Sequence, residues 1–294
     1  MPFTPPQTIT FIGVGAIGLP MALQLKGAGF EVTGVDPVEA SRERGVAAGL
    51  DMEVVPDSVR TADAVVVMVA TPEQLDTALG GDGGVIAAMR PGAALIVMST
   101  VGPEAVVRAA EQAASAGVRI LDVPVTGGVA GAERGALTLF ASGEAAVIEG
   151  HRPVLECFGR VVEAGARIGD GQAFKAVNQL LCSVNLAAAA EALAFARALG
   201  LDPEQVLAAV EQGAGGSWML SDRGPRMLEG PEARVTSAVS IFVKDAGLVA
   251  DIADAQGFDA PLVRAARARF DLAAAAGMAQ LDDSQVIRTY STEG

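Results

Sequence analysis

The first half of the chain alternates short apolar runs with longer, helix-compatible stretches. β-Branched runs of four to eight residues indicate buried strands at residues 8–15, 31–36, 64–70, 94–99 and 119–123. Between them, residues 19–30 and 103–117 are compatible with helices. This alternation predicts a parallel sheet covered on both faces, which is a doubly wound α/β domain. Residues 135–143 predict one more strand, which we expect to be the last of this domain.

After about Gly165 the pattern becomes Ala-rich and almost free of strand signals. Helical patterns follow at residues 172–199, 203–212, 238–256 and 261–276. The first is apolar around most of its circumference between Lys175 and Glu191, as in a helix buried between domains or in a subunit interface. We therefore predict a mainly parallel α/β domain over residues 1–165 and an all-helical domain over residues 166–294.

Composition and charge exclude several classes of protein. Of the 294 residues, 51% are hydrophobic and 19% are charged, which argues against disorder. The net charge of −14 is spread over both halves, so we expect no nucleic-acid partner. Cys157 and Cys182 indicate neither a disulfide framework nor a metal site. Without a signal peptide or a long enough apolar span, we expect a cytoplasmic protein with no membrane partner.

The segment GVGAIG, residues 13–18, ends an apolar strand and precedes a helix. Gly13 permits a tight turn, Gly15 lets the backbone approach a pyrophosphate, and Gly18 allows close helix–strand packing. Asp36 ends the next strand, where a carboxylate binds ribose hydroxyls, and no Arg directly follows it. The pattern predicts a Rossmann domain that binds NAD, with NADP less favoured. The predicted cofactor-binding residues here are Gly13, Gly15, Ala16, Ile17, Gly18, Asp36 and Thr100.

A turn follows the strand at residues 119–123, in the segment DVPVTGGVAGAERGALTL, residues 122–139. Ligands bind beyond the carboxyl ends of strands in such sheets. The Thr126 hydroxyl and the backbone N–H groups of Gly127 and Gly128 are donors suited to a carboxylate. The alternative is a flexible Gly-rich loop that binds nothing.

A second polar cluster lies in GDGQAFKAVNQ, residues 169–179. Lys175, Asn178 and Gln179 share one helix face by their spacing. Burial and the positive helix end both disfavour the ammonium, so we expect the pKa of Lys175 to fall, as suits a general base. The alternative is a lysine that reaches solvent from the first turn. We expect His151, the single histidine, to lie at the surface, which disfavours a histidine-based mechanism.

These segments together resemble the β-hydroxyacid dehydrogenases, a family that includes 3-hydroxyisobutyrate dehydrogenase and tartronate semialdehyde reductase. FIGVGAIGLPMA is similar to the family's N-terminal signature, residues 122–139 to its substrate segment, residues 169–179 to its catalytic segment, and FVKDAGLVAD to its C-terminal Lys-Asp segment. The resemblance covers nearly the whole chain. It implies that Lys175 is the acid/base, that Thr126, Gly127 and Gly128 hold the substrate carboxylate, and that Asn178 positions the substrate.

The resemblance also implies roles for residues of the second half. Lys244 would lie beside the cofactor, and Asp245 would support the site. Gln179 stands where the family often has a second Asn, which resembles the acid-sugar branch. GGSWML, residues 237–253 and DDSQVIRTY further resemble L-threonate dehydrogenases, in which the position of Asn178 is often His. Trp218 would help to shape the pocket, unless it only packs in the core.

We therefore expect an NAD-dependent oxidoreductase that transfers a hydride between nicotinamide and a small C3–C4 hydroxy acid or acid sugar, such as threonate or 3-hydroxyisobutyrate. Its site would lie in the cleft between the domains, and the chain would form a homodimer or homotetramer. The alternatives are a tartronate or succinic semialdehyde-type reductase, an imine reductase, a 6-phosphogluconate-type enzyme and a non-catalytic nucleotide-sensing module. Imine reductases usually lack the lysine, and the 6-phosphogluconate type needs a basic phosphate pocket that the sequence does not reveal.

Overall fold

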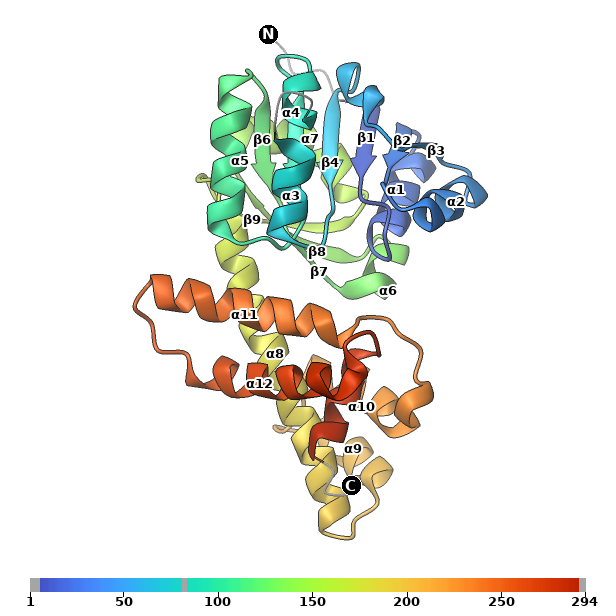
Figure 1. Ribbon diagram of the computed structural model, residues 1–294, viewed down its shortest axis with the longest axis vertical. Helices are drawn as coiled ribbons and strands as arrows, with labels where there is room; N and C mark the ends of the chain where they lie inside the picture. The colour runs from blue at the N-terminus through green and yellow to red at the C-terminus, as the bar shows by residue number, and fades with distance from the viewer. Residues whose placement is uncertain (1–5, 81–83, 291–294) are drawn as a thin grey trace. The chain divides into compact units, whose positions relative to one another are not determined.

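The apolar runs of the first half form one sheet in the computed structural model, which describes residues 6–80 and 84–290 (Figure 1). Its strand order is β3-β2-β1-β4-β5-β6-β8-β7, with β9 paired to β8. Strands β1 to β6 are parallel, whereas β8 is antiparallel to β6. The strands are β1 Thr8–Ile12, β2 Glu31–Val35, β3 Asp51–Glu53, β4 Ala64–Val67, β5 Ala94–Val97, β6 Arg119–Asp122, β7 Val125–Thr126, β8 Leu137–Ser142 and β9 Gly159–Gly165.

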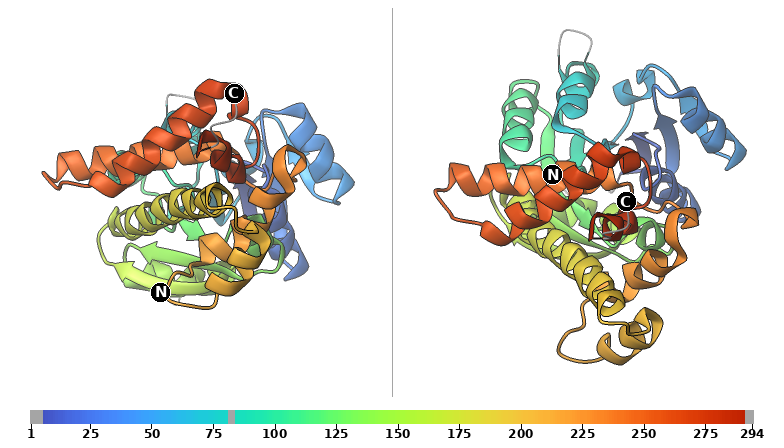
Figure 2. Two further views of the ribbon diagram at one scale, coloured as in Figure 1. Left: turned by 90° about the horizontal axis from the view of Figure 1, so that it is seen from below. Right: turned by 60° about the horizontal axis from the view of Figure 1, so that its bottom comes forward.

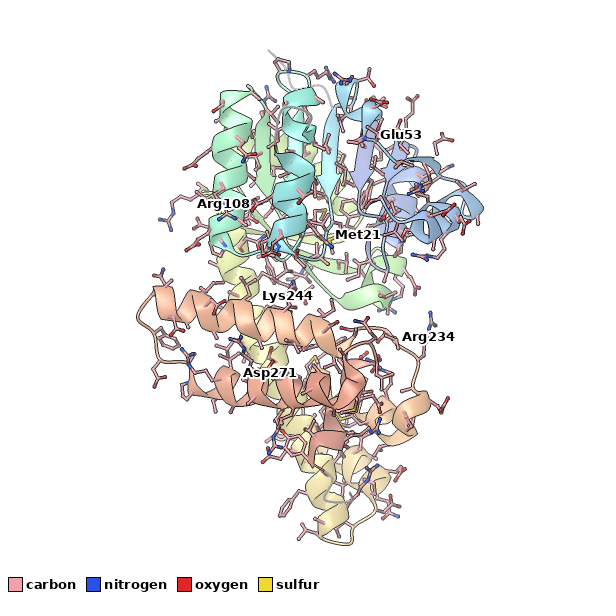
Figure 3. All side chains as sticks on the ribbon, viewed as in Figure 1. Met21, Glu53, Arg108, Arg234, Lys244 and Asp271 are labelled. Carbon is pink, nitrogen blue, oxygen red and sulfur yellow. The ribbon has the colours of Figure 1, made fainter. Side chains whose placement is uncertain are left out.

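Helices cover both faces of this sheet, as the sequence predicts. Val65 and Val66 are both fully buried, because they pack on opposite faces. One face packs against α1 and α7, with Met21 of α1, labelled in Figure 3, in that core, and the other packs against α3, α4 and α5 (Figure 1). The helices are α1 Gly18–Gly27, α2 Glu39–Ala47, α3 Pro72–Leu79, α4 Val85–Ala88, α5 Pro103–Ser115, α6 Gly128–Glu133 and α7 Ala145–Glu156, with a 3-10 helix at Asp57–Arg60.

The prediction that residues 135–143 form the last strand is wrong, because β9 follows α7 and pairs in parallel with β8. Its sequence GRVVEAG carries Arg160 and Glu163, and no residue of β9 is fully buried. An edge strand pairs on one side only, so it lacks the continuous apolar run of a central strand. That physical difference explains why periodicity did not reveal it.

The chain divides into two compact units, residues 1–175 and 176–294. The second unit is helical, and its helices α11 and α12 run side by side, with the rings of Phe242 and Phe270 5.2 Å apart (Figure 2). The helices are α8 Asp170–Ala198, which begins in the first unit, α9 Pro203–Val210, α10 Trp218–Glu229, α11 Val239–Ala255 and α12 Pro261–Ala273. A π turn follows at Ala274–Met278, and 3-10 helices lie at Gly230–Glu232 and Asp283–Tyr290.

The expected helical patterns of the second half are present, but α10 was not expected. Gly224 and Pro225 lie inside it, and a Gly-Pro pair normally indicates a turn. At Gly224 a Cβ would come 2.7 Å from Leu207 Cδ1, so the glycine allows α10 to approach α9 closely. Tertiary packing therefore overrides the local turn signal.

By length and composition alone, α8 could cross a membrane, since its most apolar 18-residue window has a mean hydropathy of 1.4. Within the structure 44% of that window is buried. A core helix of a water-soluble protein meets the same criterion.

His151 is buried, so its predicted surface position is wrong. It lies on the inner face of α7, with 3% of its surface exposed, and its Nδ1 is 2.8 Å from the carbonyl oxygen of Val147. Burial lowers the pKa of His151 below 6.5, and Arg119 lowers it further, while the bond to Val147 and the charge of Asp63 oppose the shift. The imidazole is therefore neutral in the folded protein near pH 7.

We expect this neutral histidine to make stability depend on pH. Below about pH 6.5 His151 is protonated in the unfolded chain but stays neutral in the folded chain. The free energy of unfolding should therefore fall by up to about 1.4 kcal/mol for each unit by which the pH is lowered. Urea unfolding at pH 7.5, 6.5 and 5.5 would measure this loss. His151→Gln cannot titrate, so its unfolding free energy should change less over the same range. An equal slope in the two proteins would contradict the assignment.

Candidate active site

The loop between β1 and α1 is shaped by two glycines that admit no side chain. Gly13 has φ of +90°, and a Cβ there would lie 2.2 Å from the carbonyl oxygen of Met68. At Gly18 a Cβ would lie 1.9 Å from the carbonyl oxygen of Gly13. The turn and the close helix–strand packing expected of these glycines are therefore present.

Gly15 differs, because no atom lies within 4 Å of a Cβ built on it. Ala16 is exposed, Ile17 is half-buried, and α1 begins at Gly18, so the amides of this loop precede the first helical hydrogen bonds. The loop follows β1 where the strand order reverses, between β2 and β4. In open α/β sheets ligands bind at such a point, and the open space at Gly15 fits a pyrophosphate.

Asp36 follows β2 and is buried, with 7% of its surface exposed. Its Oδ2 accepts a hydrogen bond from Val14 N at 3.0 Å, and its Oδ1 accepts one from Val38 N at 2.9 Å. The carboxylate is thereby fixed beside the glycine loop, where the adenosine ribose of a dinucleotide lies. Arg42 of α2 also reaches this turn, a contact that the sequence analysis missed.

The carboxyl ends of β5 and β6 lie along the same edge of the sheet as the glycine loop, because these strands are parallel to β1. Thr100 is half-buried in the loop after β5, and the next two amides, Val101 N and Gly102 N, each donate to Gln172 Oε1 at 3.0 Å. Gln172 Nε2 donates to Ser99 O at 3.0 Å. This glutamine therefore ties the beginning of α8 to the loop that carries Thr100.

Asp122, at the end of β6, completes that attachment although sequence reasoning assigned it no role. It is fully buried and accepts hydrogen bonds from Gly169 N, Gln172 N, Gln172 Nε2 and Ser142 Oγ at 2.9–3.1 Å. Burial raises the pKa of Asp122, while these four hydrogen bonds lower it. The contacts fix the first turn of α8, the helix that carries Lys175, against the sheet edge.

We expect Asp122→Asn to lower the melting temperature by several degrees. An amide presents N–H groups to donors that need an acceptor, and each buried unsatisfied group costs about 1–3 kcal/mol. Each kcal/mol corresponds to roughly 2–4 °C in a protein of this size class. Asp170→Asn is the matched control, because Asp170 bonds Arg167 near the surface. Equal melting of both variants would show that the Asp122 network contributes nothing.

The turn after β7 holds three predicted substrate residues. Thr126 is half-buried and pairs with Thr138 of β8. Gly127 and Gly128 have φ of +129° and +64°, which disfavour other residues. A Cβ at Gly127 would come 3.0 Å from Leu137 Cδ2, whereas one at Gly128 would meet no atom within 4 Å. The turn is therefore a fixed backbone conformation with an open side at Gly128.

Lys175 lies in the second turn of α8 with only 6% of its surface exposed. The simple alternative of a lysine extended into solvent is therefore wrong. It follows Gln172 by three residues, so the attachment of α8 described above fixes the position of its backbone.

In the helical unit, four of the predicted residues form one connected network. Asn178 Nδ2 donates to Gln179 Oε1 at 2.8 Å, and Gln179 Nε2 donates to Asp245 Oδ2. Lys244 Nζ lies 2.8 Å from Asp245 Oδ1, and Figure 3 shows Lys244 on α11. Asn178 Nδ2 also lies 3.4 Å from Cys182 Sγ. α8 and α11 thus hold these side chains in fixed relation to each other.

Trp218 is 59% exposed at the start of α10, so it is not a core residue. The guanidinium of Arg223 lies 5.4 Å from its ring centroid. Arg223 in turn donates to the buried Asp283 at 3.0 Å. The indole is therefore held at the surface by a cation that is itself fixed.

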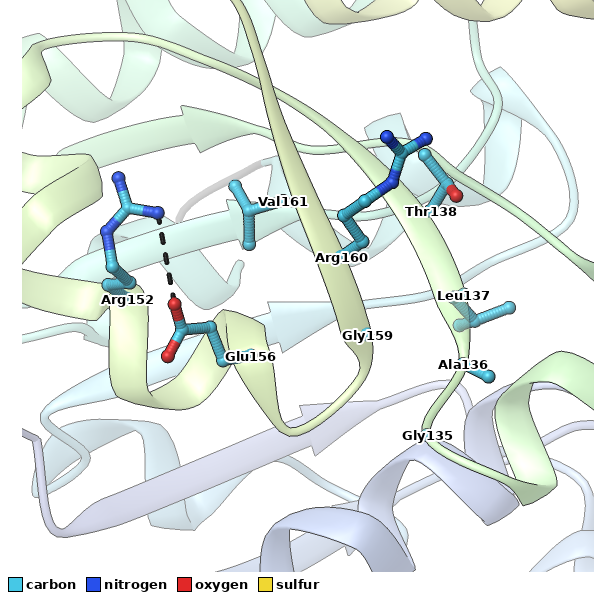
Figure 4. Close-up of a pocket in the computed structure, with 9 residues that line it drawn as sticks. All are labelled: Gly135, Ala136, Leu137, Thr138, Arg152, Glu156, Gly159, Arg160 and Val161. Atoms are coloured by element: carbon cyan, nitrogen blue, oxygen red, sulfur yellow. Dashed lines mark ion pairs between the residues drawn. The ribbon is translucent and has the colours of Figure 1, made fainter.

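A separate depression of about 650 Å³ lies over β8, β9 and α7 (Figure 4). It contains none of the predicted site residues. Arg152 on its wall is paired with Glu149 at 2.6 Å, Glu163 at 2.8 Å and Glu156 at 4.0 Å. Its charge is thus neutralised, and we assign no ligand to this depression.

Family comparisons agree with this arrangement. Residues 8–167 match the model of the NAD binding domain of 6-phosphogluconate dehydrogenase. Residues 169–290 match that of the NAD-binding domain of NADP-dependent 3-hydroxyisobutyrate dehydrogenase. The chain is 37% identical to the L-threonate dehydrogenase of Cupriavidus necator over 97% of this chain and 96% of that one.

Two further similarities extend over almost the whole chain. The 2-hydroxy-3-oxopropionate reductase of Escherichia coli is 32% identical over 95% of both chains. The crystal structure of 3-hydroxyisobutyrate dehydrogenase from Salmonella typhimurium is 33% identical, covers 96% of this chain and 99% of that one, and has a TM-score of 0.88. The chain therefore belongs to the β-hydroxyacid dehydrogenase family, in its L-threonate dehydrogenase branch, and is an oxidoreductase that acts on a CH–OH group.

Proposed function

We propose that the chain is an NAD-dependent dehydrogenase of a small C3–C4 hydroxy acid, with L-threonate and 3-hydroxyisobutyrate as first candidates. The observation that carries the proposal is the burial of Lys175 on a helix that also bears Asn178. A side chain held within the fold, on the same helix as Asn178, is positioned as proton transfer requires. The similarity to L-threonate dehydrogenases supports the substrate class.

Lys175 is the acid/base group in this proposal. Bound nicotinamide would exchange a hydride with the carbon that carries the hydroxyl. In oxidation Lys175 Nζ takes the hydroxyl proton, and in reduction it returns that proton. Asn178 would orient the substrate hydroxyl, and its Nδ2 is held by Gln179 Oε1 at 2.8 Å.

The substrate carboxylate would be bound by the turn at Thr126, Gly127 and Gly128. One hydroxyl and the backbone N–H groups of a glycine turn are suitable donors for an anion. The open side at Gly128 leaves room for it. This assignment also explains how a chain of net charge −14 binds an acid, since local donors replace a basic patch.

Asp36 supports NAD as the preferred cofactor. Its buried carboxylate would accept the ribose hydroxyls and repel a 2′-phosphate. Lys244, joined to Asp245, would lie beside the cofactor.

We propose a homodimer or homotetramer in the cytoplasm. Large apolar side chains on α8 are 46–66% exposed, namely Phe174, Val177, Leu181 and Phe195, and Leu199 just beyond the end of the helix is 58% exposed. Several large apolar side chains exposed on one helix favour an interface between subunits. Light scattering should give a mass of two or four times 29.7 kDa, and a mass of 29.7 kDa would contradict the proposal.

Turnover of a substrate panel tests the function. We expect reduction of NAD with at least one hydroxy acid among L-threonate, D-threonate, 3-hydroxyisobutyrate, glycerate and 4-hydroxybutyrate. The corresponding alcohols that lack the carboxylate should react far more slowly, because the turn at Thr126 would have no anion to bind. NAD binding without turnover of any acid, in either direction and with either cofactor, would favour a nucleotide-sensing module instead.

A further inference from the structure

Arg42 contacts the turn that follows Asp36. It lies in α2, and its side chain points back toward the end of β2. Its Nη1 donates to the carbonyl oxygens of Asp36 and Pro37, both at 2.8 Å. These two bonds fix a guanidinium beside the ribose end of the dinucleotide loop.

Asp36 and Arg42 present opposite charges to the same place. Both oxygens of Asp36 already accept a backbone N–H, so the carboxylate cannot turn away from a ligand. In the part of the chain that the structure describes, the hydrogen bonds of Arg42 all come from Nη1. Its Nε and Nη2 therefore keep a fork of N–H donors, the geometry that matches a phosphate. In dinucleotide-binding folds an acid here binds ribose hydroxyls, and a nearby Arg accommodates a 2′-phosphate.

We propose that Arg42 is a second determinant of cofactor choice, the group that receives the 2′-phosphate of NADP, and that Asp36 alone turns the preference to NAD. The inference rests on the proposed function, because it requires a dinucleotide at this loop. The acidic side chains of Glu39 and Glu43 flank Arg42 on α2 and are exposed, so solvent screens them more than it screens Asp36. The buried carboxylate is therefore the main repulsive charge that a 2′-phosphate meets.

Binding of two nucleotide fragments by calorimetry tests this without turnover. 2′,5′-ADP carries the 2′-phosphate, and 5′-AMP, which is otherwise the same molecule, does not. In Asp36→Ser we expect the affinity for 2′,5′-ADP, relative to 5′-AMP, to rise by about 10- to 100-fold, since each 1.4 kcal/mol is a factor of ten. Adding Arg42→Gln should remove about tenfold or more of that gain, as expected for a charge-assisted, bidentate contact.

Two further variants separate charge from structure. Arg44→Gln removes the same charge from the same helix, but Arg44 bonds Ser41 Oγ at 3.0 Å, so it should leave the ratio unchanged. Arg42→Lys keeps the charge without the fork and should give an intermediate ratio. A thermal melt of each variant checks that Asp36→Ser, which leaves Val14 N and Val38 N without their acceptor, remains folded. If Asp36→Ser does not fold, Arg42→Gln is tested in the wild-type background instead. There the affinity for 2′,5′-ADP should fall at least threefold more than the affinity for the fragment without the 2′-phosphate.

Two outcomes would overturn the proposal, and they differ. If Arg42→Gln weakens both fragments equally, Arg42 only holds the Asp36–Pro37 turn in place, and the cofactor site stands. If 5′-AMP binds neither to the wild type nor to any folded variant, the dinucleotide site itself is wrong, and the proposed function falls with the inference.

Discussion

Lys175→Ala should lower kcat for oxidation of the hydroxy acid by about 10²- to 10⁴-fold, the usual contribution of a positioned general acid–base group. The buried side chain would be replaced by a methyl group, and the hydroxyl proton would have no acceptor at that place. The dissociation constant of NAD should change little, because the β1–α1 loop and Asp36 belong to other segments. Steady-state kinetics and NADH fluorescence titration measure the two quantities separately.

Lys175→Arg should not restore activity, because a guanidinium keeps its proton at working pH. Lys26→Ala is the matched control, since Lys26 is an exposed lysine in the last turn of α1. If Lys175→Ala kept more than roughly a tenth of the wild-type kcat, proton transfer would belong to another group or to water.

Periodicity predicted most of the fold, and its failures have physical causes. Val65, Val66 and Val67 lie in a central strand buried on both faces, so they form the continuous apolar run that predicts a buried strand. β9 is an edge strand, and its charged residues hide it. α10 contains a Gly-Pro pair whose turn signal is overridden by packing against Leu207.

The residues of the candidate site were predictable where a residue type in a given pattern is typical of one function. A glycine loop after an apolar strand, followed by Asp36, indicates a dinucleotide, and Gly13 and Gly18 take the expected conformations. Asp122 and Gln172 gave no such signal, because an acid at a strand end is usually solvated and its burial arises from contacts far along the chain. His151 was misjudged for the same reason, since the helix face it occupies is set by the sheet beneath it.

Gly15→Ala should abolish most of the NAD affinity while leaving the protein as stable as the wild type. A Cβ at Gly15 meets no protein atom within 4 Å, and its φ is not in the left-handed region, so folding should be unaffected. The same methyl group would occupy the space where the backbone approaches the pyrophosphate. We expect the dissociation constant of NAD to rise by about tenfold or more, which corresponds to about 1.4 kcal/mol.

Gly13→Ala provides the contrast, because its methyl group would collide with the carbonyl oxygen of Met68 and require a positive φ. It should lower the melting temperature as well as the NAD affinity, since backbone strain of this kind costs about 1–3 kcal/mol. Differential scanning calorimetry with and without NAD separates the two effects: Gly15→Ala should melt like the wild type without NAD but lose the stabilisation that NAD gives. If Gly15→Ala bound NAD as tightly as the wild type, the pyrophosphate would not lie at this loop. Loss of stability in Gly15→Ala without the ligand would instead mean that Gly15 serves the fold, as Gly13 does.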